Sequence, residues 1–327
     1  MSALQPVDGA EIQILVDNVT DSLSTTPDFV ETEFAGLQRR REGLWVLGGD
    51  CLCCAAHGLS CLVTLRRGAE TRTLLFDTGP DDDTFVRNIT RLGVDLGPVD
   101  AMVLSHGHWD HGGAMLRALQ IIRDHGRGKT VPTYMHPDMF RRRAAKLPDG
   151  SFRQMADVPS VEALTLHGAA VVNTTEASSL FGDMALVSGE IPRVTPFERG
   201  LPGQHRRTLD GEGWEKDELL MDERFVAFQV VGKGLVVLSA CSHAGIINVL
   251  TRAREMYPDV PLYCAMGGLH LSGANEEIIP ETVEALQGFG LNAVAAGHCT
   301  GWRALSALHQ AFGDKLVPLA VEKRFGF

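Results

Sequence analysis

The chain has 327 residues, of which 44% are hydrophobic, so it can bury a sizeable core as one large domain or two ordinary ones. Its formal net charge is -11, with 41 acidic and 30 basic residues, which argues against broad nucleic-acid binding because such binding relies on a basic surface. No apolar run approaches the roughly 20 residues of a membrane-spanning helix, and no basic and apolar leader opens the chain. The chain has seven cysteines, an odd number that cannot all form disulfide pairs within it. We therefore expect a soluble, cytoplasmic protein with reduced thiols and no membrane partner.

Short segments rich in Val and Leu, bounded by Gly, Pro or Asp, predict strands in chain order. They lie at 11–17, 59–65, 72–77, 100–105, 132–136, 169–173, 224–231, 234–240, 261–266, 292–297 and 315–321. Apolar residues at helical spacing predict helices at 113–126, 244–257, 281–290 and 301–313. This mixture predicts an α/β (α+β) fold in which helices cover the outer faces of sheets. We expect a single domain over 1–327, with loop excursions at the polar, turn-rich stretches 146–160 and 198–223.

The segment LSHGHWDHGG at 104–113 carries the strongest chemical signal. A predicted strand ends there and presents His106, His108, Asp110 and His111 within six residues. Alternate side chains of an extended backbone point the same way, so His106 and His108 can hold one cation while Asp110 and His111 turn toward a second. The alternative is a polar loop that happens to be rich in histidine. The clustering directly after a strand favours the metal site.

This H-x-H-x-D-H pattern resembles the metallo-β-lactamase superfamily, and the resemblance covers roughly residues 55–305. It implies an αββα sandwich of two mixed sheets flanked by helices. Further motifs are similar to the branch that includes an archaeal dihydropterin-6-ylmethyl aminobenzene ribofuranosyl phosphate synthase and its bacterial relatives. These motifs are HGLS (57–60), LLFDTG (74–79), SGEIPRVTPFE (188–198), GLVVLSACSHAGIINV (234–249), MGGLHL (266–271) and GHCTG (297–301).

The resemblance also implies roles for single residues. Asp77 matches an aspartate that hydrogen-bonds around the metal loop and orients its ligands. His298 matches the last metal histidine, which completes the second site with Asp110 and His111. His243 is assigned to the first site with His106 and His108. An aspartate usually bridges the two ions, but Cys241 stands at or near that position, so either its thiolate or a water molecule forms the bridge.

Other residues carry weaker signals. His270 follows a strand in a glycine-rich turn and can face the site as a substrate- or proton-handling residue. Glu190 and Arg193 suit an anion anchor near the metals, although an exposed salt bridge beside a proline explains them as well. Thr300 follows His298 closely and is a candidate for the pocket wall. The CLCC run at 51–54 is too tightly spaced for a metal knuckle, and small buried apolar side chains are the simpler interpretation.

Two divalent ions are the expected cofactors, most readily zinc, with iron or manganese as alternatives. Such a site supports hydrolysis of an ester- or phosphoester-type small molecule by a metal-bound hydroxide, with Asp110 also accepting a proton. The resemblance implies an alternative, a pterin transferase or synthase that condenses its substrates with loss of pyrophosphate. A diiron redox protein and a non-catalytic metal-binding protein are further alternatives. The expected partner is an anionic small molecule, and a homo-oligomer is an open possibility.

Overall fold

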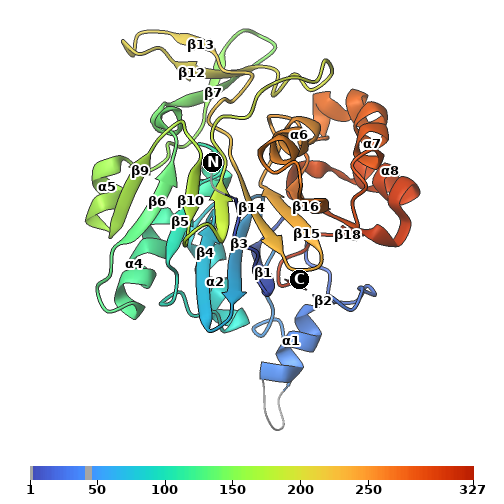
Figure 1. Ribbon diagram of the computed structural model, residues 1–327. Helices are drawn as coiled ribbons and strands as arrows, with labels where there is room; N and C mark the ends of the chain where they lie inside the picture. The colour runs from blue at the N-terminus through green and yellow to red at the C-terminus, as the bar shows by residue number, and fades with distance from the viewer. Residues whose placement is uncertain (1–2, 41–45) are drawn as a thin grey trace.

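Two sheets packed face to face form the centre of the computed structural model, which describes residues 3–40 and 46–327, and helices cover both outer faces (Figure 1). The first sheet has the order β2-β19-β1-β3-β4-β5-β6-β9. Its strands are β1 (Gly9–Val16), β2 (Val30–Glu31), β3 (Ser60–Arg67), β4 (Glu70–Phe76), β5 (Ala101–Val103), β6 (Val131–Met135), β9 (Ala169–Asn173) and β19 (Arg324–Gly326). From β4 to β9 the neighbouring strands are parallel.

The second sheet has the order β10-β11-β14-β15-β16-β17-β18. Its strands are β10 (Ser178–Leu180), β11 (Ala185–Val187), β14 (Phe225–Val230), β15 (Gly234–Ser239), β16 (Leu262–Gly268), β17 (Ala293–Gly297) and β18 (Leu316–Pro318). Strands β15 to β18 are parallel, so their carboxyl ends meet at one edge. This edge lies beside the carboxyl ends of β4 and β5 in the first sheet.

The helices form two outer layers. The first sheet is covered by α2 (Asp82–Leu92), α4 (Met115–His125) and α5 (Val161–Leu166), and the second by α6 (Ile246–Met256), α7 (Ile279–Gln287) and α8 (Trp302–Phe312) (Figure 1). The shorter pieces are α1 (Glu33–Arg40), α3 (Trp109–Gly112), η1 (Pro137–Phe140), η2 (Gly273–Ile278), η3 (His298–Thr300) and η4 (Gly313–Lys315). No helix within the described residues is long and apolar enough to cross a membrane.

Buried side chains alternate between layers of the core. In β14, Val226 and Phe228 pack between the two sheets, while Phe225 and Ala227 pack beneath the outer helices. Strands covered on both faces are apolar on both faces, which explains the continuous apolar runs in the sequence. Each predicted strand segment overlaps a strand of the structure, and each predicted helix overlaps a helix. The predicted αββα fold is confirmed by this layering.

The two stretches predicted as loop excursions require a correction, because they contain regular structure. Strands β8 (Phe152–Gln154), β12 (Gln204–Arg207) and β13 (Trp214–Lys216) join β7 (Arg143–Lys146) in a third sheet of order β13-β12-β7-β8. Charged pairs link its strands: Glu215 contacts Arg206 at 2.9 Å and Arg141 at 2.8 Å. Charged pairs and a stacked pair of rings, Phe152 and Trp214, hold this sheet in place of a continuous apolar face. Its sequence therefore lacks the alternation that reveals a half-buried strand. The single-domain organisation stays a prediction.

Candidate metal centre

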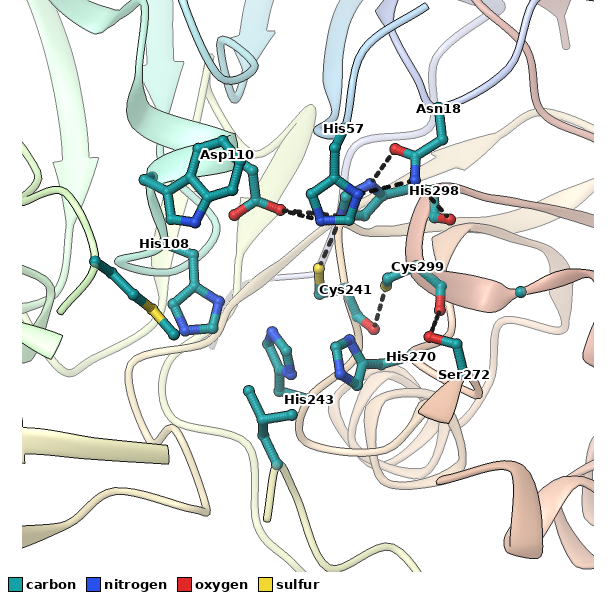
Figure 2. A pocket seen from close by; sticks show the side chains of 14 residues that line it. Asn18, His57, His108, Asp110, Cys241, His243, His270, Ser272, His298 and Cys299 are labelled. Atoms are coloured by element: carbon teal, nitrogen blue, oxygen red, sulfur yellow. Dashed lines mark hydrogen bonds and ion pairs between the residues drawn. The ribbon is translucent and has the colours of Figure 1, made fainter. Parts of the chain in front are cut away.

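Histidine, cysteine and aspartate side chains converge where strands of the two large sheets end (Figure 2). Sharp turns follow several of these strands, and four non-glycine residues adopt positive φ there: Asp77 (59°), Ser242 (57°), His270 (43°) and His298 (49°). Left-handed backbone is costly for residues with a Cβ and concentrates at functional sites. The turns direct polar side chains from both sheets into one buried volume.

The first group contains His106, His108 and His243, the three residues that the resemblance assigned to one site. Nε2 of His106 lies 3.0 Å from Nδ1 of His108 and 3.2 Å from Nε2 of His243. All three rings are buried. Burial, followed by the neighbouring histidines and Arg143, lowers the pKa of His106 well below its usual value, and burial also lowers the pKa of His108 and of His243. Neutral rings whose nitrogens face one another fit a shared cation, because a metal ligand must present a lone pair.

Hydrogen bonds set which nitrogen of each ring is free. Ser105 Oγ donates to Asp77 Oδ2 at 2.7 Å and therefore accepts from Nδ1 of His106 at 2.9 Å, so Nε2 of His106 carries the lone pair. The side-chain nitrogen of Gln204 lies 3.2 Å from Nε2 of His108, and the buried amide oxygen of Gln204 has no hydrogen-bond partner among the described residues. A flip of the amide exchanges these two atoms. If that amide oxygen accepts from Nε2, then Nδ1 of His108 also faces the group as an acceptor.

The second group contains Asp110, His111 and His298. Oδ2 of Asp110 lies 3.5 Å from Nε2 of His111 and 3.6 Å from Nε2 of His298. Burial lowers the pKa of His298 well below its usual value. Burial has the same tendency at His111, but the carboxylates of Asp110 and Asp77 outweigh it and raise that pKa to about 9. A cation bound here has to displace the His111 proton, so affinity for it should rise with pH up to that value.

Cys241 lies between the two groups. Its Sγ is 3.2 Å from Nε2 of His111 and 3.2 Å from Nε2 of His298. Sγ also lies within 4.8 Å of a ring nitrogen of His106, which belongs to the first group. This is the place that the predicted bridge requires, and Figure 2 shows the sulfur pointing toward His298. The donor sets therefore fit two divalent cations with a sulfur between them, while the identity of the metal stays a prediction.

Asp77 makes hydrogen bonds that reach both groups, and its role in orienting metal ligands stays a prediction. Its Oδ1 accepts from the Ser105 amide at 2.7 Å, and its Oδ2 lies 2.7 Å from Nδ1 of His111. Through Ser105 it also orients His106. Carboxylates in this position hold the tautomer and direction of a metal-binding imidazole.

Two further carboxylates, those of Asp222 and Glu223, support the site, and no motif in the sequence marks them. Asp222 accepts from the Gly107 amide at 2.8 Å and from Arg143 at 2.8 Å, and all three are buried. A Cβ at Gly107 would lie 2.0 Å from Nη1 of Arg143, so the histidine loop needs glycine there. Glu223 accepts from the amides of His243 and Ala244 at 2.7 and 2.6 Å. The only signal in the sequence was two acidic residues directly before a buried strand.

A cavity of about 370 Å³ opens onto these groups. Its wall includes the expected His270 together with His57, Trp109, Met155, Leu201 and Asn18. Nε2 of His57 lies 3.4 Å from Asp110 Oδ2, and Asn18 contacts Nδ1 of His57 at 3.1 Å and Nδ1 of His298 at 2.9 Å. Asn18 carries no motif, so only the contact between the segment after β1 and the turn after β17 reveals it.

Three residues predicted for the substrate pocket lie elsewhere. Glu190 contacts His136 at 3.1 Å, and Arg193 donates to the backbone carbonyls of Ile191, Leu219 and Leu220. Thr300 is buried, accepts from the Leu269 amide at 3.1 Å and donates to Gly297 O at 2.6 Å. None of the three appears in the cavity wall of the described residues. Thr300 instead connects the turn that carries His270 to the turn that carries His298. The anion-anchoring role of Glu190 and Arg193 stays a prediction without support from this geometry.

Ligand groups at the strand ends of an αββα sandwich define a protein of the metallo-β-lactamase fold. Residues 58–171 of the chain match the family model of the metallo-β-lactamase superfamily. The chain is 26% identical over 275 residues to the 7,8-dihydropterin-6-methyl-4-(beta-D-ribofuranosyl)-aminobenzene-5'-phosphate synthase of Methanocaldococcus jannaschii, a match covering 83% of this chain and 90% of that enzyme. The resemblance predicted from the motifs is thereby confirmed.

Two other relatives are similar over most of their length. An uncharacterized protein of the same archaeon is 28% identical over 258 residues, which covers 78% of this chain and 88% of the relative. The crystal structure of a metal-dependent hydrolase of the beta-lactamase superfamily superimposes with a TM-score of 0.69, at 20% identity and over 97% of this chain and 98% of that chain. The similarity to this crystal structure concerns the fold alone.

Proposed function

We propose that the chain is a metal-dependent transferase that joins a pterin-type donor to an aromatic amine. The similarity to the archaeal synthase supports the substrate class, because the match extends over 90% of that enzyme and its name describes a pterin, a methyl link and an aminobenzene. In the proposed step the carbon–oxygen bond to a leaving diphosphate breaks, a carbon–nitrogen bond to the amine forms, and the amine loses one proton.

The protein's own side chains fit parts of this step. Divalent ions held by the two groups would supply positive charge for the leaving diphosphate. Asp110 and His57 lie 3.4 Å apart at the cavity wall, and His57 is largely exposed to the cavity, so this pair is placed to accept the amine proton. Asn18 holds both His57 and His298 in position.

The similarity to the archaeal synthase carries the choice between condensation and hydrolysis, because the ligand groups themselves fit both reactions. The Cys241 sulfur lies between the two ligand groups, so it would help to hold the ions in either reaction. Hydrolysis of an ester or phosphoester, the first expectation from the sequence, is therefore the second candidate.

One assay separates the two functions. The protein is purified without oxygen, its metals are quantified, and it is incubated with a dihydropterin-methyl diphosphate with or without an aminobenzene substrate. The proposal expects diphosphate release that depends on both metal and amine, together with a pterin–amine product. The hydrolase would be favoured if diphosphate release did not depend on the amine. It would also be favoured if the protein turned over only phosphodiesters, lactones or thioesters.

Cys241→Ser is expected to lower bound metal and the rate of condensation by roughly tenfold, because a hydroxyl is a weaker bridge than a thiolate. Metal analysis and steady-state rates measure both effects. Cys264→Ser is the matched control, since Cys264 is an equally buried thiol inside β16 that lies away from the ligand groups. Unchanged metal content and rate in Cys241→Ser would make the thiol a bystander.

A further inference from the structure

A second cavity lies directly beside the first. It has a volume of about 340 Å³ and is lined by Val19, Thr20, Asp21, Gly297, His298, Gly301, Trp302, Leu305, Pro318 and Leu319. His298 and Gly301 line both cavities, and Asn18 of the first cavity directly precedes Val19 of the second. One thin wall, made of the turn after β17 and the segment after β1, therefore separates this side cavity from the metal-ligand groups.

Trp302 gives the side cavity an aromatic wall. Its side chain is 71% exposed, although large apolar side chains are usually covered. The Arg303 guanidinium lies 4.6 Å from the ring centroid, and Arg303 in turn contacts both carboxylate oxygens of Glu276, at 2.9 and 3.1 Å. This stack holds the indole from one side and leaves an ordered, accessible ring surface, which suits a planar aromatic ligand.

Asp21 adds a specific polar group to this apolar wall. Its carboxylate accepts from Lys323 at 3.0 Å and from the Ser24 amide at 3.1 Å, which leaves accepting capacity on both oxygens. Its side chain remains 24% exposed. Such a carboxylate selects a ring that carries N–H donors and disfavours an anionic ring.

We infer that the side cavity binds the flat, N–H-rich ring of the pterin-type substrate. The ring stacks on Trp302 and donates hydrogen bonds to Asp21, and its diphosphate extends over the edge of the wall, beside His298 and Gly301, to reach the metal-ligand groups. The aromatic amine then enters through the main cavity, past His57 and Trp109. The identity of the ring rests on the proposed function, whereas the existence of an aromatic site rests on the side cavity itself.

Binding of 6-hydroxymethylpterin to the metal-loaded full chain tests this inference, because that compound lacks the diphosphate and depends on ring contacts. Trp302→Ala is expected to weaken binding about tenfold, the effect of one lost stacking contact, whereas Trp302→Phe retains most of the affinity. Asp21→Asn should also weaken binding, with thermal unfolding as a check because Asp21 contacts the buried Lys323. Leu166→Ala removes a similarly exposed apolar side chain on α5 and should change nothing.

The outcomes separate the two proposals. Trp302→Ala could bind the pterin as tightly as the parent protein does and still release diphosphate when amine is present. That result would overturn the side-cavity site and leave the proposed function standing. Absence of pterin binding to the parent protein would overturn the site as well. Pterin binding that depends on Trp302, without any amine-dependent release of diphosphate, would support the site and count against the proposed function.

Discussion

Replacing Asp110 with alanine is expected to reduce metal-dependent turnover by roughly 100-fold or more and to remove about one metal ion per chain. Asp110 supplies the carboxylate of the second group, with Oδ2 at 3.5 Å from His111 and 3.6 Å from His298. The same oxygen lies 3.4 Å from His57 and belongs to the pair proposed to accept a proton. Steady-state rates and metal analysis on the same preparation measure both losses.

The fold should survive this change, because the ion-pair contacts of the Asp110 carboxylate are confined to the site. Circular dichroism and thermal unfolding check that expectation. Asp124→Ala, on the exposed side of α4, is the control and should leave rate and metal content unchanged. Full activity in Asp110→Ala would contradict the assignment of the second group.

Asp222→Ala is expected to lower the free energy of unfolding by about 3 kcal/mol, the usual cost of removing one partner of a buried ion pair. The substitution leaves the Gly107 amide without its acceptor and leaves Arg143 with Asp217, 3.3 Å away, as its remaining carboxylate. Gly107 lies between His106 and His108, so the first group should also bind metal less tightly. Denaturant titrations of the metal-free protein measure stability apart from metal binding.

Asp157→Ala tests whether burial is the cause of the large loss of stability expected for Asp222→Ala. Asp157 also contacts an arginine, Arg142, at 3.2 Å, but both side chains are about half exposed or more. Exposed pairs contribute about 1 kcal/mol or less, so this variant should remain close to the parent protein. Equal destabilisation by the two substitutions would show that Asp222 has no special part in holding the histidine loop.

Local sequence was enough to predict much of the architecture. Apolar runs such as 234–240 predicted β15 because both faces of that strand are buried, and helical spacing predicted α6 and α8 for the same reason. Helix α2 was missed although Phe85, Ile89 and Leu92 have helical spacing, Asp81 caps its start and Gly93 ends it with φ 63°. Strands β12 and β13 were missed because charged pairs between them, rather than an apolar face, hold them together.

The sequence by itself determined that His106, His108, Asp110 and His111 act as one unit, because six consecutive residues after a strand cannot separate far. Only the tertiary structure decided how distant residues join them. Cys241 comes 130 residues after His111, and its Sγ reaches the space between the two groups because β15 ends at the shared edge and the chain turns at Ser242. The same pairing of strands decided that Asn18, Gln204 and Asp222 contact this site while Arg193 does not. Spacing along the chain carries no information about such contacts, because they depend on which strand ends meet.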